Sequence, residues 1–414
     1  MFIRKIIPAV ILISFSFFSL SCDNAVDPVS NISGKVYSYN HQPVSNIKVT
    51  IQDNFTYTSF DGSFNFKGVS FPYDATVMDS LGKKVTFFKY LSTDNINLVL
   101  TESAYNLSHA LVQVTVPQNI ISNGLKGKII FTDYDRISSY SDISLQSTQS
   151  YLIVYINQSV TGRIMLLTYK KDSTGRIISY DNYGESLNIS LQPGGSFQYT
   201  FDSSSISLDP GEKTITGSFT YPYILSFIET GFYLSFANSI EFENSDILFS
   251  QIENNIFNFI VPTGIPSQFK IIAENASGFG STGGSRESFI VLPDVPNNFE
   301  IKSPPSLISP EDEMTNVTRD TKFSYEKGGG KGIYAITVRN RSRYAIYTII
   351  TADNSFTLGD CYDAGLGSLN NNDFSWYVNK YGPAESMNDH VTNYFYESVR
   401  FYSGTYPRDF TTAP

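Results

Sequence analysis

Few side chains in this sequence have the type and spacing that catalysis or metal binding requires. The two cysteines, Cys22 and Cys361, and the three histidines show no CxxC or HxxxH spacing of the kind that holds zinc. Cys361 could act as a nucleophile only beside a histidine base, so we interpret it as a small buried hydrophobic residue. No G-x-S-x-G motif of a serine hydrolase is present. We therefore expect no enzyme activity and no cofactor.

Two glycine-rich segments match phosphate-binding motifs only in their letters. Gly278–Gly283 has the pattern G-x-G-x-x-G, but the strand pattern Ser288–Leu292 follows it, where that motif needs the start of a helix. Lys327–Gly332 lacks the P-loop spacing and joins two strand patterns. We interpret both segments as hairpin loops, so the sequence predicts no nucleotide site.

The net charge argues against a nucleic-acid partner. The chain carries 39 acidic and 29 basic side chains, for a net charge of −10, and has no basic stripe.

Acidic residues offer two further kinds of chemistry. A glycosidase needs a pair of carboxylates at a set separation, and no pair stands out. Calcium prefers oxygen ligands and could be bound in one loop-rich region, but ordinary turn chemistry is the favoured interpretation. The acids of that region are Asp353, Asp360, Asp363 and Asp373.

Two sets of residues are candidates for binding. Exposed tyrosines can stack on the apolar face of a sugar, and three loop tyrosines could do so, although most of the 28 tyrosines are expected in strands. The polar segment Glu385–His390 lies between the last two strand patterns, and loops on a rigid scaffold often carry binding residues. The candidate sugar platforms are Tyr381, Tyr394 and Tyr396. The residues expected to contact a protein or glycan partner are Asn388, Asp389 and His390.

The N-terminus has the features of an export signal. A basic head is followed by an apolar run, Ile6–Phe18, and residues 1–21 fit a secretory signal peptide. Ser19–Cys22 resembles the lipobox of bacterial lipoproteins, in which the cysteine is diacylated and becomes the new N-terminus. The resemblance implies a lipid on Cys22 that holds the protein on a membrane of the cell envelope, expected to be the outer membrane. Ordinary cleaved secretion and an uncleaved anchor helix are the alternatives.

After a polar tether, residues 22–30, the pattern changes to alternating strands. Ile32–Val36 and Val49–Ile51 alternate, and Asp61-Gly62 between alternating apolar residues is a strong hairpin signal. On these pieces, residues 31–100 resemble a carboxypeptidase regulatory-like domain, which is a small transthyretin-like β-sandwich. The resemblance implies a non-catalytic spacer or binding module.

The middle of the chain, from residue 105 to 302, also predicts β-sandwiches. Short strand patterns recur with turn signals between them, as all-β sandwiches require. Ile215–Phe219 echoes Ile32–Val36 and follows the turn cluster Asp209–Gly211. We therefore place a boundary near residue 208 and predict two units, 105–207 and 208–302. One larger sandwich is the alternative.

A proline-rich stretch leads into the last predicted domain. Residues 303–414 resemble a fibronectin type III-like sandwich, with Phe323–Tyr325, Tyr334–Val338 and Phe374–Val378 at the positions of three of its strands. Trp376, the single tryptophan, is expected in the core between the two sheets, because it buries a large apolar area.

These patterns predict an all-β chain of tandem β-sandwich domains, Ig-like or transthyretin-like, behind a lipoprotein signal peptide. The expected function is that of a non-enzymatic, lipid-anchored envelope protein that serves in binding, adhesion or as a scaffold. The alternative is a glycan-capturing lipoprotein or a carboxylate-dependent glycosidase with its site in residues 105–302. A third interpretation treats every unit as a spacer.

Overall fold

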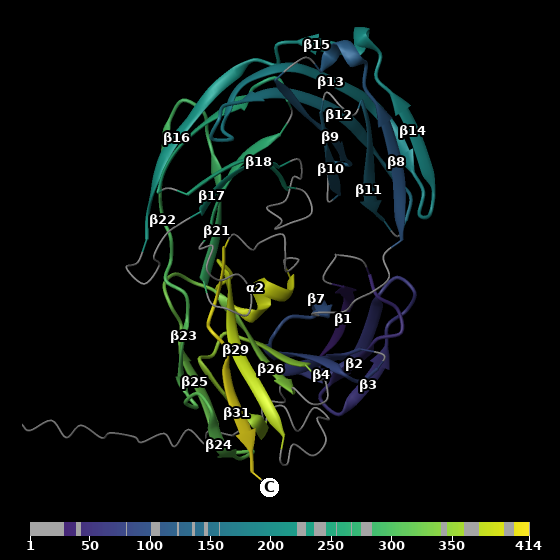
Figure 1. The fold of residues 1–414 in the computed structure, drawn as a ribbon. Helices are drawn as coiled ribbons and strands as arrows, with labels where there is room; N and C mark the ends of the chain where they lie inside the picture. The colour runs from purple at the N-terminus through teal and green to yellow at the C-terminus, as the bar shows by residue number, and fades with distance from the viewer. Residues whose placement is uncertain are drawn as a thin grey trace, which may run out of the picture.

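The fold is all-β, as the sequence predicts (Figure 1). The computed structural model describes residues 29–38, 43–79, 81–100, 108–121, 124–134, 137–144, 148–156, 158–221, 229–235, 246–253, 255–265, 267–274, 284–340, 346–359, 372–392 and 401–413. Several residues singled out in the sequence lie outside these ranges. They are Cys22, Gly278–Gly283, Asp360, Cys361, Asp363, Tyr394 and Tyr396.

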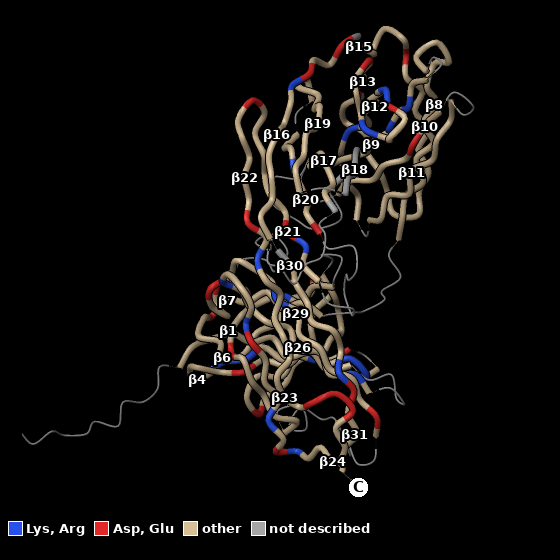
Figure 2. Tube along the Cα trace, turned by 60° about the vertical axis from the view of Figure 1, so that its left-hand side comes forward, with Lys and Arg blue, Asp and Glu red and all other residues tan. Residues whose placement is uncertain are grey.

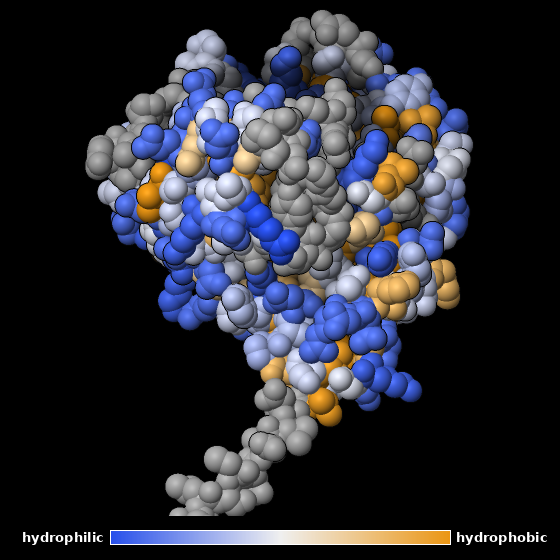
Figure 3. All heavy atoms as spheres, turned by 90° about the horizontal axis from the view of Figure 1, so that it is seen from below, coloured by the Kyte–Doolittle hydropathy of each residue, from blue (hydrophilic) through white to orange (hydrophobic). Residues whose placement is uncertain are grey.

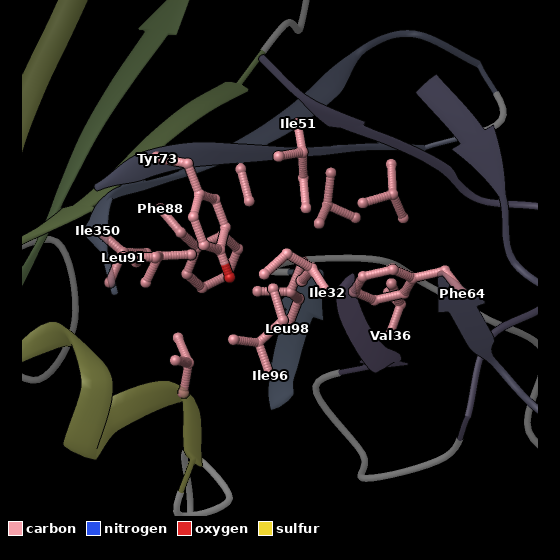
Figure 4. Packing of buried hydrophobic residues seen from close by; sticks show 14 of the residues in the cluster. Ile32, Val36, Ile51, Phe64, Tyr73, Phe88, Leu91, Ile96, Leu98 and Ile350 are labelled. Carbon is pink, nitrogen blue, oxygen red and sulfur yellow. The ribbon is translucent and has the colours of Figure 1, made fainter. Parts of the chain in front are cut away.

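The first sandwich consists of two sheets packed face to face. One sheet has the order β4-β1-β7, in which β1 pairs antiparallel with β4 and parallel with β7. The other has the order β3-β2-β5-β6. Alternating residues from both sheets fill the core between them (Figure 4). The strands are β1 (Val29–Ser38), β2 (Lys48–Ile51), β3 (Asn54–Tyr57), β4 (Ser63–Ser70), β5 (Tyr73–Met78), β6 (Lys84–Leu91) and β7 (Asn95–Leu100).

The second sandwich repeats this strand order. Its sheets are β11-β8-β14 and β10-β9-β12-β13, and β8 pairs antiparallel with β11 and parallel with β14. A short strand, β15, extends the second sheet at β13. The elements are β8 (His109–Thr115), η1 (Gln118–Ile120), β9 (Leu125–Thr132), β10 (Ser138–Ile143), β11 (Gln149–Tyr155), β12 (Val160–Lys171), β13 (Ile177–Leu191), β14 (Ser196–Thr200), η2 (Ser203–Ser205) and β15 (Ile206–Leu208).

The third sandwich has the same arrangement again. Its sheets are β19-β16-β22 and β18-β17-β20-β21, and β16 pairs antiparallel with β19 and parallel with β22. We call these three sandwiches the first, second and third repeats. The strands are β16 (Glu212–Thr220), β17 (Glu229–Ser235), β18 (Asp246–Glu253), β19 (Ile256–Pro262), β20 (Gln268–Glu274), β21 (Gly284–Val291) and β22 (Pro296–Glu300).

Two glycines explain why β1 and β16 have similar sequences. A Cβ atom on Gly34 would lie 2.1 Å from the carbonyl oxygen of Ile96, in the neighbouring parallel strand. A Cβ on Gly217 would lie 1.8 Å from the carbonyl oxygen of Asn297, in the corresponding strand of the third repeat. Only glycine allows such close backbone approach, so both central strands need it at the same place.

The C-terminal sandwich packs the sheet β23-β25-β28 against β27-β26-β29-β31. Trp376 lies between the two sheets with no exposed surface and contacts the ring of Phe323 edge-on, at 5.1 Å between ring centroids. This is the core position predicted from the sequence. The strands are β23 (Ser306–Ser309), β24 (Met314–Val317), β25 (Lys322–Glu326), β26 (Ile333–Asn340), β27 (Ile346–Thr351), β28 (Ser355–Thr357), β29 (Asp373–Gly382) and β31 (Arg408–Thr412).

Strand pairing joins the first repeat, the third repeat and the C-terminal sandwich into one 14-stranded sheet. Strand β27 pairs in parallel with β6 of the first repeat. Between β29 and β31, the chain leaves the C-terminal sandwich and forms helix α2 (Met387–Thr392) and strand β30 (Phe401–Gly404). β30 pairs with β21 of the third repeat, and α2 packs on β6 and β7 of the first repeat (Figure 1).

The second and third repeats share a hydrophobic cluster. Ile130, Met165 and Leu167, on the outer face of a second-repeat sheet, belong to the same cluster as Phe232 and Phe259 of the third repeat. The strands β9 and β12 are therefore buried on both faces along most of their length. Each unit is therefore packed against another one: the second repeat shares a hydrophobic core with the third repeat, and the other units share the 14-stranded sheet.

Candidate functional site

An open groove of about 400 Å³ lies on the outer face of the first repeat, over strands β2, β5 and β6. The outer face is the face turned away from the core of the sandwich. Because side chains alternate along a strand, the residues between the core positions Val49, Ile51, Ala75 and Val77 point into this groove. The lining residues are Thr50, Gln52, Pro72, Tyr73, Asp74, Thr76 and Tyr90.

A β-bulge shapes one end of the groove. The register between β5 and β6 shifts between Tyr73 and Ala75, and Tyr90 sits at the bulge with a φ of 59°. The carboxylate Oδ1 of Asp74 accepts a hydrogen bond from the Tyr90 backbone N–H at 2.9 Å. Bulges re-aim side chains at functional sites. Here the bulge holds Tyr90 with 59% of its surface exposed.

The floor beneath this end is fixed by a buried tyrosine. Tyr73 is 3% exposed, and its hydroxyl donates to the Thr93 carbonyl oxygen at 2.7 Å. Burial raises the pKa of Tyr73 well above its ordinary value, so the hydroxyl remains a donor at every physiological pH. Figure 4 shows its ring beside Phe88 and Leu91 in the core of the first repeat. The groove therefore rests on a packed core.

The groove offers hydrogen-bonding groups and little that could perform catalysis. Thr50 and Thr76 supply hydroxyl groups, and Gln52 is exposed, with its amide nitrogen donating to the Ser70 carbonyl oxygen at 3.2 Å. Asp74 is the one acidic side chain among the described lining residues. Glycoside hydrolysis needs two carboxylates, and the described lining holds one. Its hydroxyl, amide and carboxylate groups can hydrogen-bond a ligand.

Aromatic side chains continue the face beyond the groove. Phe55 on β3 lies directly opposite Thr50 in the strand register and is 60% exposed. The Lys48 ammonium group lies 4.8 Å from the centre of the Phe55 ring, and the Tyr57 ring stands edge-on to it. On the side of the molecule that Figure 3 presents, exposed hydrophobic residues form separate groups among hydrophilic ones.

The equivalent face of the second repeat is covered. There the outward positions of β9 and β12 hold Ile130, Met165 and Leu167, which are buried in the cluster shared with the third repeat. In the first repeat the corresponding strands β2 and β5 carry Thr50 and Thr76, and the face is open. The same topology thus uses this face for packing in one repeat and leaves it polar and accessible in another.

The structure places the predicted partner residues in helix α2, against the first repeat. His390 is 2% exposed, and burial lowers its pKa to about 3. The side-chain oxygen of Asn388 accepts a hydrogen bond from the Ser92 backbone N–H at 2.8 Å. Asp389 is exposed and bonds with Ser386 at the start of the helix. A contact with an external partner at these residues stays a prediction.

The other predicted sites are brought together only in part. Tyr381 is half-buried and packs against Tyr402, so it is no free platform. Of the four acids in the loop-rich region, Asp353 and Asp373 are described, and Asp373 accepts a hydrogen bond from Thr411 at 3.0 Å. Among the described residues no cluster of three or more histidine, cysteine, aspartate or glutamate side chains could hold a metal ion.

A group of polar residues in the second repeat bears on the alternative site in residues 105–302. Both carboxylate oxygens of Glu185 accept hydrogen bonds, one from Arg163 at 2.5 Å and one from the Tyr183 hydroxyl at 2.9 Å. The Arg163 guanidinium lies over the Tyr134 ring at 4.3 Å. Glu185 is thus held in a structural ion pair rather than aimed at an open groove.

Sequence reasoning missed the groove of the first repeat. The alternation of polar residues along β2 and β5 predicts an outward face, but every sandwich has one. The signal that distinguishes this face is the placement of its neighbours, and that depends on contacts between distant parts of the chain.

In the part of the chain that the structure describes, no helix is both long and apolar enough to span a bilayer.

Comparisons with known proteins identify no family. No protein-family model matches the chain, and no curated protein does. Among solved structures, the Bacillus anthracis TIE protein aligns over 66% of this chain and 50% of its own length, at 10% identity and a TM-score of 0.16. A streptococcal ancillary pilin aligns over 74% of this chain and 96% of its own, at 7% identity and a TM-score of 0.18.

A leucine-rich repeat protein from Bacteroides thetaiotaomicron aligns at 12% identity with a TM-score of 0.15. This chain spans half the length of the Bacillus anthracis protein and about a quarter of that of the Bacteroides protein. With TM-scores this low, none of these likenesses carries an argument about function.

Proposed function

We propose that this protein is a non-catalytic binding module of the bacterial cell envelope, held on the membrane by a lipid at Cys22. The observation that supports a binding role most strongly is the open polar groove of the first repeat. It presents an exposed Tyr90 beside hydroxyl, amide and carboxylate groups, on a face that the second repeat buries. Such a combination of one aromatic surface and a few fixed polar groups is typical of ligand sites.

The arrangement of the units supports presentation of this groove from a rigid body. The first repeat, the third repeat and the C-terminal sandwich share one sheet, and helix α2 ties the C-terminal sandwich to the first repeat. A site on a rigid scaffold loses little conformational entropy when it binds. The protein therefore acts in adhesion or ligand capture, by presenting one preformed face on a rigid body.

Cells that display the full chain test the binding role. Their retention on surfaces coated with mucin, collagen or cellulose is compared with that of cells displaying Tyr90→Ala and of cells lacking the protein. Tyr155→Ala is the matched control, since Tyr155 is also a strand tyrosine and 57% exposed. We expect Tyr90→Ala to lose the retention and Tyr155→Ala to keep it. Equal retention of both variants, or none by the wild type, would overturn the proposal.

A separate experiment addresses the membrane anchor. Cells fed a labelled fatty acid should incorporate the label into the wild-type protein, and Cys22→Ala should abolish both the label and the association with membranes. A Cys22→Ala protein that still fractionates with the envelope would contradict anchoring through this residue.

A further inference from the structure

We propose that the ligand of this groove is an uncharged polysaccharide chain, bound across strands β6, β5, β2 and β3. This inference rests on the proposed binding function and names the ligand class for the same site. It follows from three features of the described residues: the row of outward side chains across the sheet, the chemistry of that row and its charge.

The row is set by the strand register. Thr76 on β5 lies opposite Thr50 on β2, and Thr50 lies opposite Phe55 on β3. On β6 the residue opposite Thr76 is Phe87, which is 8% exposed, and Tyr90 lies further along that strand at the bulge, where its backbone is tied to Asp74 on β5. The line from Phe55 to Tyr90 therefore crosses the strands obliquely. Neighbouring strands lie about 4.8 Å apart, so β6 and β3 are separated by roughly 14 Å. Two exposed aromatic rings thus border a polar strip that is longer than a single sugar ring.

The chemistry of the row matches that of a sugar chain. A pyranose ring has an apolar face of C–H groups, which packs on an aromatic ring, and hydroxyl groups around its edge. Tyr90 and Phe55 supply aromatic surfaces. Between them, the hydroxyl groups of Thr50 and Thr76 can both donate and accept hydrogen bonds. One sugar would engage one aromatic ring, whereas a chain engages both and the hydroxyl groups between them.

The charge of the face argues for an uncharged polymer. Asp74 is the one charged side chain in the described lining, and a lysine stands over each bordering ring. The Lys48 ammonium group lies 4.8 Å from the centre of the Phe55 ring and the Lys89 ammonium group 5.9 Å from the centre of the Tyr90 ring. These charges are single and of both signs, on a chain whose net charge is −10, so the face has no cluster of positive charge that would hold the carboxylates of an acidic polysaccharide. In the coloured part of the trace in Figure 2, lysine and arginine are scattered among acidic and uncharged residues. Binding of a neutral chain should therefore depend little on salt.

A peptide partner would use this region differently. β3 ends the 14-stranded sheet, so a peptide could pair with its backbone edge. Such pairing would involve the edge of β3 and would leave Tyr90, three strands away, without a role. The exposure of Tyr90 beside a groove is explained by a ligand that crosses the strands.

Purified full-length protein in detergent provides the test. Its mobility in native gels is compared with and without soluble neutral polymers (dextran, mannan and hydroxyethyl cellulose), acidic polymers (alginate and hyaluronan) and the cationic polymer chitosan. We expect at least one neutral polymer to bind, with the same affinity in 50 mM and 500 mM salt and with longer oligomers binding more tightly than the monosaccharide.

Three variants and one control locate the binding. Tyr90→Ala and Phe55→Ala should each weaken it about tenfold, which corresponds to about 1.4 kcal/mol. Thr50→Val, which keeps the size of the side chain and removes the hydroxyl, should weaken it less, and Tyr155→Ala should leave it unchanged. Because the substituted residues lie at the surface, equal melting temperatures would show that each variant folds.

The outcomes separate the ligand class from the binding role. Salt-sensitive binding of only charged polymers, or neutral binding that survives both aromatic substitutions, would overturn the inference. If no polysaccharide binds while Tyr90→Ala still abolishes retention of cells, the ligand class is wrong and the binding role remains. If Tyr90→Ala affects neither measurement, both are wrong.

Discussion

At the scale of single residues, buried ionisable groups lie where the units meet. Glu287 on β21 is 4% exposed and accepts a hydrogen bond from the backbone N–H of Lys302, at the start of the C-terminal sandwich. Nearby, the fully buried Lys380 ammonium donates to the carbonyl oxygens of Gly329 and Gly330, at 2.7 and 2.6 Å. Buried charges are costly unless paired, so these junctions should respond to pH.

Glu287→Gln should stabilise the protein at alkaline pH. Burial raises the pKa of Glu287 from 4.5 to about 7, so the folded state keeps its proton at a pH where the unfolded chain has lost it. The stability that this provides is present below pH 4.5 and is lost as the pH rises through 7. At pH 8, Glu287→Gln should therefore be up to about 3 kcal/mol more stable than wild type, and at pH 4.5 the two should be equal.

Denaturant unfolding at the two pH values measures this difference. The control is Glu300→Gln, whose carboxylate is largely exposed and pairs with the Lys302 ammonium group. It should change stability by less than about 1 kcal/mol. If Glu287→Gln were no more stable than wild type at pH 8, the junction would stabilise the charged carboxylate as well as water does, which would contradict the raised pKa of Glu287.

His390 should make the protein sensitive to acid. Burial lowers its pKa from 6.5 to about 3. Between these pH values the unfolded chain binds a proton at this side chain and the folded protein does not. Stability should fall as the pH drops from 6.5 towards 3, by at most about 1.4 kcal/mol per pH unit. Unfolding curves at pH 7 and 5 should show a smaller loss for His390→Gln than for wild type. His109→Gln, at an exposed position, should behave as wild type does; an unchanged loss in His390→Gln would refute the assignment.

At the scale of elements, helix α2 and strand β30 connect three units. The excursion between β29 and β31 places Met387 and Val391 in the core of the first repeat, in the same hydrophobic cluster as Ile350 of β27 and Leu91 of β6. The sequence predicts a polar contact segment here, since Glu385–His390 has no sustained apolar stripe. It cannot show that two apolar side chains of so short a helix complete the core of a sandwich nearly 300 positions earlier.

Met387→Ala should destabilise the whole protein and not only the helix. Removing a buried methionine side chain leaves a cavity and costs about 2–5 kcal/mol, and the cavity lies in the core of the first repeat. Thermal unfolding should therefore shift to lower temperature in one transition. Met314→Ala is the control, because Met314 is 41% exposed and should lose little. A normal melting temperature for Met387→Ala would mean that α2 does not secure the first repeat.

At the scale of the whole molecule, strand patterns predict the sandwiches better than they predict their assembly. Alternation and the Asp61-Gly62 turn predict the first sandwich, and the echo between Ile32–Val36 and Ile215–Phe219 reflects a shared strand topology. The burial of β9 and β12 on both faces is also indicated by the local sequence, because these strands contain runs of consecutive apolar residues, Ile129–Phe131 and Ile164–Leu167. No such local pattern indicates the parallel pairing of β6 with β27, because any exposed edge strand could form that pairing. The groove follows from that assembly, since its face is open only where no other unit covers it.

The most direct test of a binding face on the first repeat is hydrogen–deuterium exchange of the full chain, with and without the soluble form of whichever coating retains the displaying cells. We predict slower exchange in peptides that cover residues 48–57 and 73–91, and unchanged exchange in β11, which carries the exposed Tyr151 and Tyr155, and in its neighbour β8. Protection confined to β8 and β11, or to helix α2, would contradict the account and place the binding face elsewhere.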